Sequence, residues 1–429
     1  MKRFKRFIPV IGIAGMAALI LLVPLMGACG GNGNGTPTAT SSPTTTQSPT
    51  GTKKTVITIG NHTDLTGVAA IAMETVNLGV DDIVRYYNEN NLIPGIQVEV
   101  IKYDGQADPS KNVPGWQWLK ERGADVIVAW FPFLAISLQP LAEKDKIPLF
   151  VAQAPSELVK TPGYLFLTAP RLEDQAWNLI KWIMENDWDW RTKGPAKIGG
   201  AVGDTDGYQP ALDTLKKYAE MHPEQATWVG GYTLPTSGFQ WGTAVEALKD
   251  CDYIFPLNLF PFFAKDYATA GYSKAKLIGT DSHMGWYEIV TDMKLWPKID
   301  GMILITQSEW WGEDADYMNL SMELINKYHP GSAKEIMAAG HSYNSIANGM
   351  MILESIKNAA AKVGPENVDS QAIYEGAQEI KIVFDGLQRF SFSPTKRTAP
   401  DRLAIYKTDS TNKTNVRVSE WFPIEPAPE

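Results

Sequence analysis

The sequence predicts an α/β fold in which parallel strands alternate with helices. One unit of the pattern lies within Ala124–Ser156. An apolar, β-branched run at Val126–Ala129 is followed by apolar residues at helical spacing over Ile136–Lys144, and a second apolar run follows at Leu149–Ala152. Strands that are buried on both faces have continuous apolar runs of this kind. Strand, helix and strand in this order form a βαβ unit with parallel strands and a right-handed crossover.

The residues before this unit show the same alternation. We expect strands at Thr55–Gly60 and Gln97–Tyr103, and helices at Ala69–Asn88 and Val113–Arg122. Together with the unit above they form a β-α-β-α-β-α-β series. Such a series predicts an open, doubly wound sheet with helices on both faces.

The pattern then repeats, which predicts a second α/β lobe. The expected strands of this series are Lys197–Val202, Thr227–Gly231, Tyr253–Leu257, Lys276–Gly279 and Gly301–Thr306. The expected helices are Gln175–Asn186, Ala211–Met221, Thr243–Lys249 and Pro261–Ala270. Further helices are expected at Asn319–His329, His341–Ala361 and Gln371–Ala377, and strands at Gln388–Ser391 and Leu403–Thr408.

Residues 1–28 predict a lipoprotein signal peptide. A basic start precedes an apolar run at Ile8–Leu25. Leu25-Met26-Gly27-Ala28-Cys29 resembles a bacterial lipobox, in which Cys29 becomes the lipidated N-terminus. An uncleaved transmembrane anchor is the alternative, because the apolar run is about long enough to span a bilayer. Residues 29–54 hold this lipid-anchor cysteine and a Gly-, Thr- and Ser-rich flexible linker. Either interpretation tethers the protein to the outer face of a membrane.

Charge and motif content exclude several classes of function. Without the signal peptide, 35 basic and 48 acidic residues remain, a net charge of −13 that argues against nucleic-acid binding. Cys251 is the only cysteine besides Cys29, so no disulfide framework is expected. The chain has no nucleophile elbow, zinc-protease motif or phosphate-binding loop, and its five histidines lack metal-site spacing. We therefore expect no catalytic residue, no metal and no cofactor.

Several motifs occur in an order that resembles a known family. They are ITIGNHTDLTG, GVDDIVRYYNENN, VIKYDGQADPSK, LIGTDS, SYNSIANGMMILESI and FDGLQRFSFSP. Their order and spacing resemble the substrate-binding proteins of bacterial branched-chain amino acid ABC transporters, which have the type I periplasmic-binding fold. The resemblance covers about Thr55–Phe422.

This resemblance implies two Rossmann-like lobes joined by three crossover strands, with a ligand cleft between them. One lobe would be residues 55–170 plus 303–387, the other residues 171–302 plus 388–422, and residues 423–429 would be a tail. The lobes would close on a small-molecule solute by a hinge. The partners would be that solute and the ABC permease subunits, and the protein is expected to be a monomer.

The ends of two predicted strands supply the first candidate ligand-binding residues. Ligands of such sheets bind beyond the C-terminal ends of the strands. In amino-acid-binding relatives, small Ser, Thr or Gly residues and a hydroxyl occupy these ends. Here they carry Trp130, Phe131 and Phe133 after the first strand, and Gln153 and Ser156 after the second. This departure favours a more hydrophobic or aromatic ligand, such as an aromatic carboxylate or amide, or a bulky hydrophobic amino acid.

The facing lobe supplies the remaining candidates. Leu259 and Phe260 match the family's aromatic residue that covers the ligand. Asp281 matches the acidic partner of the ligand ammonium, although a turn role is equally compatible with its position. Tyr208 lies in a turn at a strand end that faces the cleft.

The expected function is that of a lipid-anchored, extracytoplasmic solute-binding protein of the bacterial cell envelope. It would capture an amino-acid-like or hydrophobic solute and deliver it to an ABC permease. A sensor built on the same fold is one alternative. A hydrolase on this scaffold is the other, because a fold does not determine a function.

Overall fold

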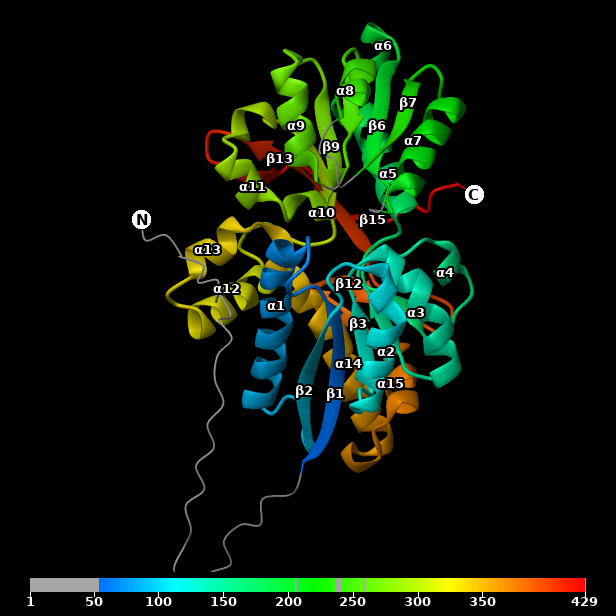
Figure 1. The fold of residues 1–429 in the computed structure, drawn as a ribbon, viewed down its shortest axis with the longest axis vertical. Coiled ribbons are helices and arrows are strands. Elements are labelled where there is room, and N and C mark those ends of the chain that lie inside the picture. Colours follow the sequence, from blue (N-terminus) through cyan, green and yellow to red (C-terminus); the bar gives the residue numbers. More distant parts are fainter. Residues whose placement is uncertain (1–53, 205–206, 236–240, 258, 429) are drawn as a thin grey trace, which may run out of the picture. The chain divides into compact units, whose positions relative to one another are not determined.

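The computed structural model describes residues 54–204, 207–235, 241–257 and 259–428. It has an α/β fold with two large sheets, so the predicted fold class is confirmed (Figure 1). The signal peptide, Cys29 and all of the linker before Lys54 lie outside the described residues. Within the described ranges, no helix combines the length and the hydropathy of a membrane span.

The first sheet has five parallel strands in the order β2-β1-β3-β4-β5. Its strands are β1 (Thr55–Thr63), β2 (Ile96–Asp104), β3 (Val126–Ala129), β4 (Leu149–Val151) and β5 (Leu165–Leu167). The helices between them are α1 (Ala70–Glu89), η1 (Pro109–Lys111), α2 (Asn112–Glu121), α3 (Pro132–Asp145) and α4 (Glu157–Lys160).

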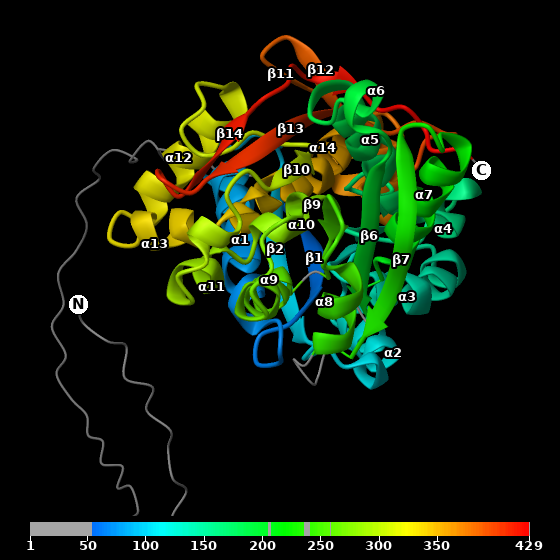
Figure 2. The same cartoon turned by 90° about the horizontal axis from the view of Figure 1, so that it is seen from above.

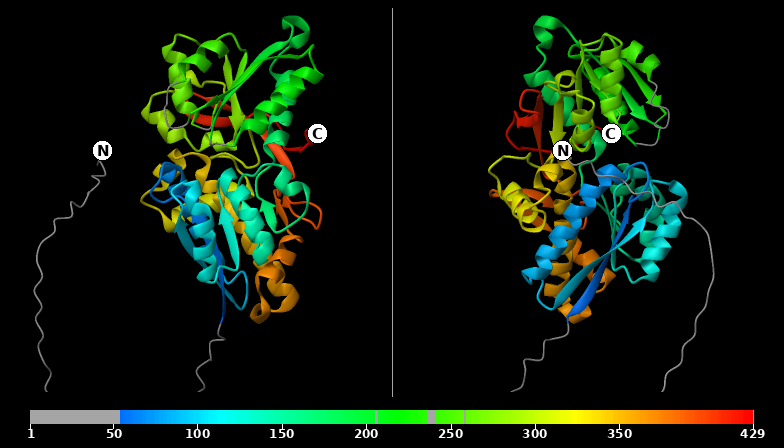
Figure 3. Two further views of the ribbon diagram at one scale, coloured as in Figure 1. Left: turned by 45° about the vertical axis from the view of Figure 1, so that its right-hand side comes forward. Right: turned by 60° about the vertical axis from the view of Figure 1, so that its left-hand side comes forward.

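Alternation along each strand builds a core on both faces of this sheet. In β3, Val126 and Val128 pack with α1 and α14 (Ile346–Val363), whereas Ile127 and Ala129 pack with α2 and α3. The blue α1 and the cyan α2 and α3 accordingly lie on opposite sides of the blue strands in the right-hand view of Figure 3. Because helices cover both faces of this sheet, its strands consist of continuous apolar runs.

The second sheet is mixed and has eight strands, with the main order β14-β13-β10-β9-β8-β6-β7 and β15 paired to β13. Its parallel strands are β6 (Ala196–Gly203), β7 (Ala226–Leu234), β8 (Tyr253–Phe255), β9 (Lys276–Thr280) and β10 (Ile303–Thr306). From the end of the chain, β13 (Arg402–Asp409) runs antiparallel beside β10, with β14 (Thr414–Arg417) beside β13 (Figure 2). The short strand β15 (Phe422–Pro423) also pairs with β13.

Helices also cover both faces of the second sheet. Ile303 and Ile305 of β10 pack with α5 and α7, and Leu304 packs on the other face with α8 and α9. The helices of this region are α5 (Leu172–Asn186), α6 (Trp190–Lys193), α7 (Gln209–Met221), α8 (Gly242–Leu248), α9 (Phe260–Thr269), α10 (Asp281–Met284), α11 (Tyr287–Asp292) and η2 (Trp296–Lys298).

The chain returns to the first sheet through a helical segment. It comprises α12 (Asp316–Tyr328), α13 (Ala333–Ala338), η3 (His341–Ser345), α14, η4 (Pro365–Asn367) and α15 (Ser370–Ala377). A two-stranded antiparallel sheet of β11 (Lys381–Phe384) and β12 (Leu387–Ser391) follows. The strand Ile303–Thr306, which the expected boundary at residue 303 assigns to the first lobe, pairs in the second sheet.

In the first sheet and its helices, two differences from the sequence-based expectation have identifiable reasons. Helix α3 begins at Pro132 rather than Ile136, because a proline is well accommodated in the first helical turn, where no N–H bond is needed. Strand β5 was not predicted, because three apolar residues give too short a signal to separate a strand from a loop.

Candidate functional site

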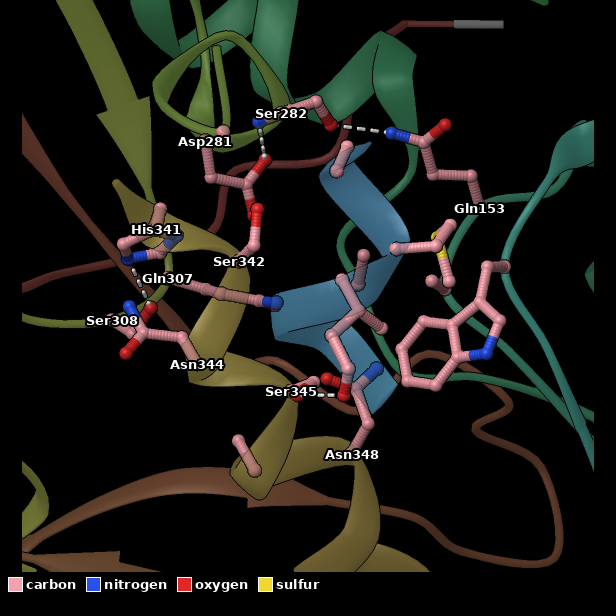
Figure 4. Close-up of a pocket in the computed structure, with 18 of the residues that line it drawn as sticks. Gln153, Asp281, Ser282, Gln307, Ser308, His341, Ser342, Asn344, Ser345 and Asn348 are labelled. Atoms are coloured by element: carbon pink, nitrogen blue, oxygen red, sulfur yellow. Dashed lines mark hydrogen bonds between the residues drawn. The ribbon is translucent and has the colours of Figure 1, made fainter. Parts of the chain in front are cut away.

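A cavity of about 200 Å³ lies where residues of both sheets meet. The first sheet contributes the segments after β3, β4 and β5 together with the start of α1, and the second sheet contributes α10 and the segment after β10. Helices η3 and α14 complete the lining (Figure 4). The cavity therefore lies at the strand ends where open α/β sheets bind ligands.

One wall of the cavity is apolar. Ala69, Ala72, Met73 and Val76 lie along one face of the start of α1, at the spacing that places helical residues on one side. The indole of Trp130 adds an aromatic surface.

Hydrogen bonds fix the Trp130 ring in this wall. Its Nε1 donates to Asn61 Oδ1 at 2.8 Å, and Asn61 Nδ2 donates to Asn77 Oδ1 at 2.9 Å. Trp130 is 7% exposed, so its N–H needs such a partner. The indole is thus held by a chain of polar groups that links β3, β1 and α1.

The opposite side of the cavity is polar. His341, Ser308 and Asn344 gather there in Figure 4, and Ser308 Oγ lies 2.9 Å from His341 Nε2. The side chains of Asp281 and Ser342 point toward one another. Asp281 Oδ1 accepts a hydrogen bond from the Ser282 N–H at 3.0 Å. The cavity can therefore bind a solute with one polar end and one apolar end.

Asp281 is the only full charge expected on the described lining at neutral pH. Burial raises the pKa of Asp281 to about 6, so most of its carboxyl is ionised at pH 7. Burial lowers the pKa of His341 to about 4, which leaves its imidazole neutral. None of the described lining residues is Lys or Arg. The described residues also form no cluster of His, Cys, Asp and Glu that could hold a metal.

Gln153 connects the two sides of the cavity. It follows β4 of the first sheet, and its Nε2 donates to Tyr208 Oη at 2.9 Å and to Ser282 Oγ at 2.5 Å. Both acceptors belong to the part of the chain that carries the second sheet. The two N–H groups of this amide are therefore used in contacts that cross the cavity.

Comparison with known proteins decides the family. A match to the periplasmic binding protein family spans residues 56–413, which is most of the chain. The chain belongs to the periplasmic binding protein family. Membership of this family indicates a solute-binding protein that acts outside the cytoplasm. No curated protein sequence matches the chain.

Solved structures support the same fold for this periplasmic binding protein. A branched-chain amino acid ABC transporter protein from Thermus thermophilus with bound valine has a TM-score of 0.74 at 18% identity, over 86% of this chain and 97% of that one. A fatty acid ABC transporter substrate-binding protein from Thermomonospora curvata has a TM-score of 0.72 at 18% identity, over 87% and 96% of the two chains. An ABC transporter solute-binding protein from R. palustris in complex with 4-hydroxybenzoate has a TM-score of 0.70 at 20% identity, over 87% and 98%. Identities this low establish the fold and leave the ligand open.

Some of the residues expected to bind ligand lie on the cavity. Trp130, Phe131, Gln153 and Asp281 line it. They lie together because each follows the C-terminal end of a strand, as the general rule for parallel sheets requires.

The other predicted ligand residues lie outside this lining. Tyr208 is buried behind Gln153, and Phe133 stacks on Phe131 with ring centroids 5.3 Å apart. Ser156 donates to Glu173 and borders another hollow. Phe260 is fully buried in the core 5.8 Å from the His283 ring, and Leu259 precedes α9 beside that core. Because α9 starts at Phe260, the Phe260 side chain points into the core beside the second sheet and not into the cavity.

Several lining residues were not predicted. They come from the start of α1, from the segment after β10, and from η3 and the start of α14, and they are Ala69, Ala72, Met73, Val76, Gln307, Ser308, His341, Ser342, Asn344, Ser345 and Asn348. The strand-end rule could have identified Gln307 and Ser308, which directly follow β10. The α1 and η3 residues carry no comparable local signal, because only tertiary packing brings these two helices together.

Gly340 permits η3 to approach α10 closely, and its replacement by alanine is expected to disturb the cavity. Its φ is +87°, and a Cβ there would lie 2.0 Å from the Met284 carbonyl oxygen. Both the backbone strain and the clash oppose Gly340→Ala, so we expect a loss of roughly 1–3 kcal/mol in unfolding free energy from strain alone. Gly271 has a φ of +85° with no atom within 4 Å of the added Cβ, so Gly271→Ala is the matched control. Equal melting temperatures for the two variants would show that the close approach of Gly340 to α10 does not contribute to stability.

Three buried histidines predict lower stability in acid. Burial lowers the pKa of His62, His283 and His341 to about 4. Their pKa in the unfolded chain is about 6.5, so protons favour unfolding as the pH falls from about 6.5 toward 4 and have no such effect above 6.5. Each histidine can then lower the free energy of unfolding by up to about 3 kcal/mol, at 1.36 kcal/mol per pKa unit. Asp281 acts in the opposite sense, because its pKa is raised.

Urea titrations at a series of pH values measure this dependence. We expect the free energy of unfolding to fall below about pH 6.5, and His283→Gln to make the fall shallower. His283 is fully buried and forms hydrogen bonds with the Thr280 N–H and the Pro256 carbonyl, so its replacement also changes the absolute stability. The relevant readout is therefore the slope of the unfolding free energy against pH. A variant with the wild-type slope would contradict the assignment.

Proposed function

We propose that this periplasmic binding protein captures a small hydrophobic or aromatic, amino-acid-like solute outside the cell and delivers it to an ABC permease. The observation that carries the proposal is a cavity that combines one carboxylate, Asp281, with an apolar wall of Trp130, Phe131 and α1. An ammonium or amide nitrogen would pair with the carboxylate, and an apolar body would cover the wall. A volume of about 200 Å³ suits a small solute, since sites for drug-sized ligands measure roughly 300–1,000 Å³.

Capture is proposed to use hinge closure of two lobes. The sequence-based division was residues 55–170 with 303–387, and residues 171–302 with 388–422. We change one boundary of this division and place the second crossing just after Thr306, because β10 pairs within the second sheet. Ligand contacts that exist only in the closed arrangement would shift the population toward it. We further propose that Cys29 carries a lipid that anchors the protein to the outer face of the cytoplasmic membrane.

One observation favours a hydrolase as a second candidate. Ser308 Oγ and His341 Nε2 lie 2.9 Å apart on the cavity, which is the separation of a nucleophile and its base. The adjacent carboxylate, Glu309, is engaged by Arg389. We therefore interpret Ser308 and His341 as part of the cavity wall rather than as a nucleophile and its base. Recovery of added ligand unchanged after prolonged incubation would support binding, and a hydrolysed product would favour the hydrolase.

A thermal-shift screen tests the proposed function. The panel contains aliphatic amino acids, aromatic acids, amines, amides and small polar solutes. Binding to the folded state raises the melting temperature by mass action. We expect shifts with hydrophobic or aromatic solutes. Shifts confined to sugars or other small polar solutes would contradict the proposal.

A further inference from the structure

The strand ends of the first sheet offer few hydrogen-bond donors to a ligand. Pro132 begins α3 shortly after β3 and has no N–H. Both N–H groups of Gln153, which follows β4, donate to Tyr208 and Ser282. A carboxylate or carbonyl oxygen of the solute therefore has to find its donors elsewhere on the cavity.

Three side chains on the polar side of the cavity carry donors that no other described residue accepts. They are the amide nitrogens of Gln307 and Asn344 and the hydroxyl of Ser342, and they come from the segment after β10 and from η3. The nearby Ser345 hydroxyl, in contrast, donates to the Val76 carbonyl at 2.7 Å. The unused donors are thus concentrated on one side of the cavity.

The two amide side chains present their nitrogens, rather than their oxygens, to the cavity. Gln307 Oε1 and Asn344 Oδ1 are buried without a hydrogen-bond partner among the described residues. In Figure 4 the Gln307 side chain extends toward α1 with its nitrogen at the tip. In the main chain of proteins an unpaired buried oxygen is less rare than an unpaired buried N–H, which favours this arrangement over the exchange of oxygen and nitrogen.

Buried hydrogen bonds fix the main chain that carries these amides. Arg389 Nη2 donates to the Gln307 carbonyl at 2.6 Å, and Arg389 is itself held by its buried ion pair with Glu309. Tyr317 Oη donates to the Asn344 carbonyl at 2.7 Å. The main chain is therefore in place before a ligand arrives, and such preorganisation favours binding because less entropy is lost.

The donors on this side of the cavity are neutral. None of the described lining residues is Lys or Arg. A group of neutral donors recognises an oxygen through hydrogen bonds, whether that oxygen belongs to a carboxylate or to a carboxamide.

We propose that Gln307, Ser342 and Asn344 form a subsite for the carboxylate or carboxamide oxygen of the solute. This inference rests on the proposed function, because the same solute places its apolar body on Trp130 and α1. Amino acids and amino acid amides carry the required oxygen. The amine with the same side chain lacks it.

Isothermal titration of the full chain at neutral pH with two matched series of compounds tests this subsite. One series is phenylalanine, phenylalaninamide and 2-phenylethylamine, and the other is leucine, leucinamide and 3-methylbutylamine. Within each series the apolar body and the amino nitrogen are kept, and only the amine lacks the acceptor oxygen. We expect the amine to bind about 30-fold or more weakly than the tighter binder of its acid and amide, as for the loss of two hydrogen bonds.

The outcomes separate this inference from the proposed function. If an amine binds as tightly as its acid and amide, the subsite is overturned and the proposed function stands. If neither series binds, the proposed function fails, and the inference fails with it. Tight binding of an acid or amide together with weak binding of its amine supports both.

The variant Gln307→Glu places the oxygen of the solute at this residue. It replaces the donor by an acceptor and keeps the length of the side chain. We expect the affinity for the acid to fall about tenfold or more, and the affinity for the amine not to fall, because the amine has no oxygen to repel. Gln371→Glu makes the same change on the exposed surface of α15, outside the cavity lining, and is the control.

A second variant removes the donor without adding a charge. Gln307→Met should lower the affinity for the acid and for the amide by about threefold or more, as for the loss of one hydrogen bond. Melting curves establish that both Gln307 variants are folded. An affinity for the acid that is unchanged or higher in folded Gln307→Glu, or unchanged in folded Gln307→Met, would overturn the proposal.

Discussion

Replacing Arg389 by leucine is expected to lower the free energy of unfolding by about 3–5 kcal/mol, because it leaves a buried carboxylate unpaired. Arg389 and Glu309 are 1% and 2% exposed and form an ion pair. Arg389 Nη2 also donates to the Gln307 carbonyl at 2.6 Å, and its guanidinium lies 3.4 Å from the centroid of the Trp421 ring. The pair thus ties the segment after β10 to β12.

Urea denaturation measures the effect, and a double variant tests its cause. In Arg389→Leu with Glu309→Leu, neither charge of the pair remains, and replacing a buried ion pair by apolar residues is often close to neutral. The double variant should therefore recover most of the stability lost in the single one. A double variant as unstable as Arg389→Leu would show that the loss comes from packing rather than from the unpaired carboxylate.

Replacing Trp130 by alanine is expected to weaken binding of an aromatic solute by roughly 2 kcal/mol or more, about 30-fold, as for a buried aromatic residue at the centre of a contact. The change removes the aromatic surface and leaves Asn61 Oδ1 without its donor. Trp130→Phe keeps an aromatic ring but a smaller one, and it loses the N–H, so its affinity should lie between those of the alanine variant and the wild type. Titration calorimetry with the best solute of the screen measures both.

A second tryptophan provides the control for this comparison. Trp118 is half-buried under the Arg122 guanidinium and does not line the cavity. Trp118→Ala should therefore leave the affinity within about twofold of the wild-type value, a difference of less than 0.5 kcal/mol. Equal losses of affinity in the Trp118 and Trp130 variants would show that Trp130 is not part of the binding surface.

The strands and helices of the sheets were largely predictable from local pattern. Val126–Ala129 was expected and observed with the same bounds, because a short apolar run rich in β-branched residues is the usual pattern of a buried strand. The three-residue strand β5 and the C-terminal strands β14 and β15 were not predicted. Their pairing is set by neighbouring strands rather than by their own residues, as is common for short strands.

The site was predictable only where strand ends form it. Gln153 and Asp281 follow parallel strands, and the general rule places such residues together. Phe260 follows a strand too, but it starts a helix whose inner face is core, and sequence cannot distinguish that outcome from exposure to the cleft. Ser342 and Ser345 reach the cavity because η3 packs on α1, a contact between segments far apart in the chain.

A crystal structure of the protein with the solute that gives the largest thermal shift tests the central claim most directly. The account predicts electron density in the cavity, with the solute nitrogen at roughly 2.7–3.2 Å from the Asp281 carboxylate and the apolar body against the Trp130 indole. A solute bound elsewhere, with its polar group away from Asp281, would contradict the account.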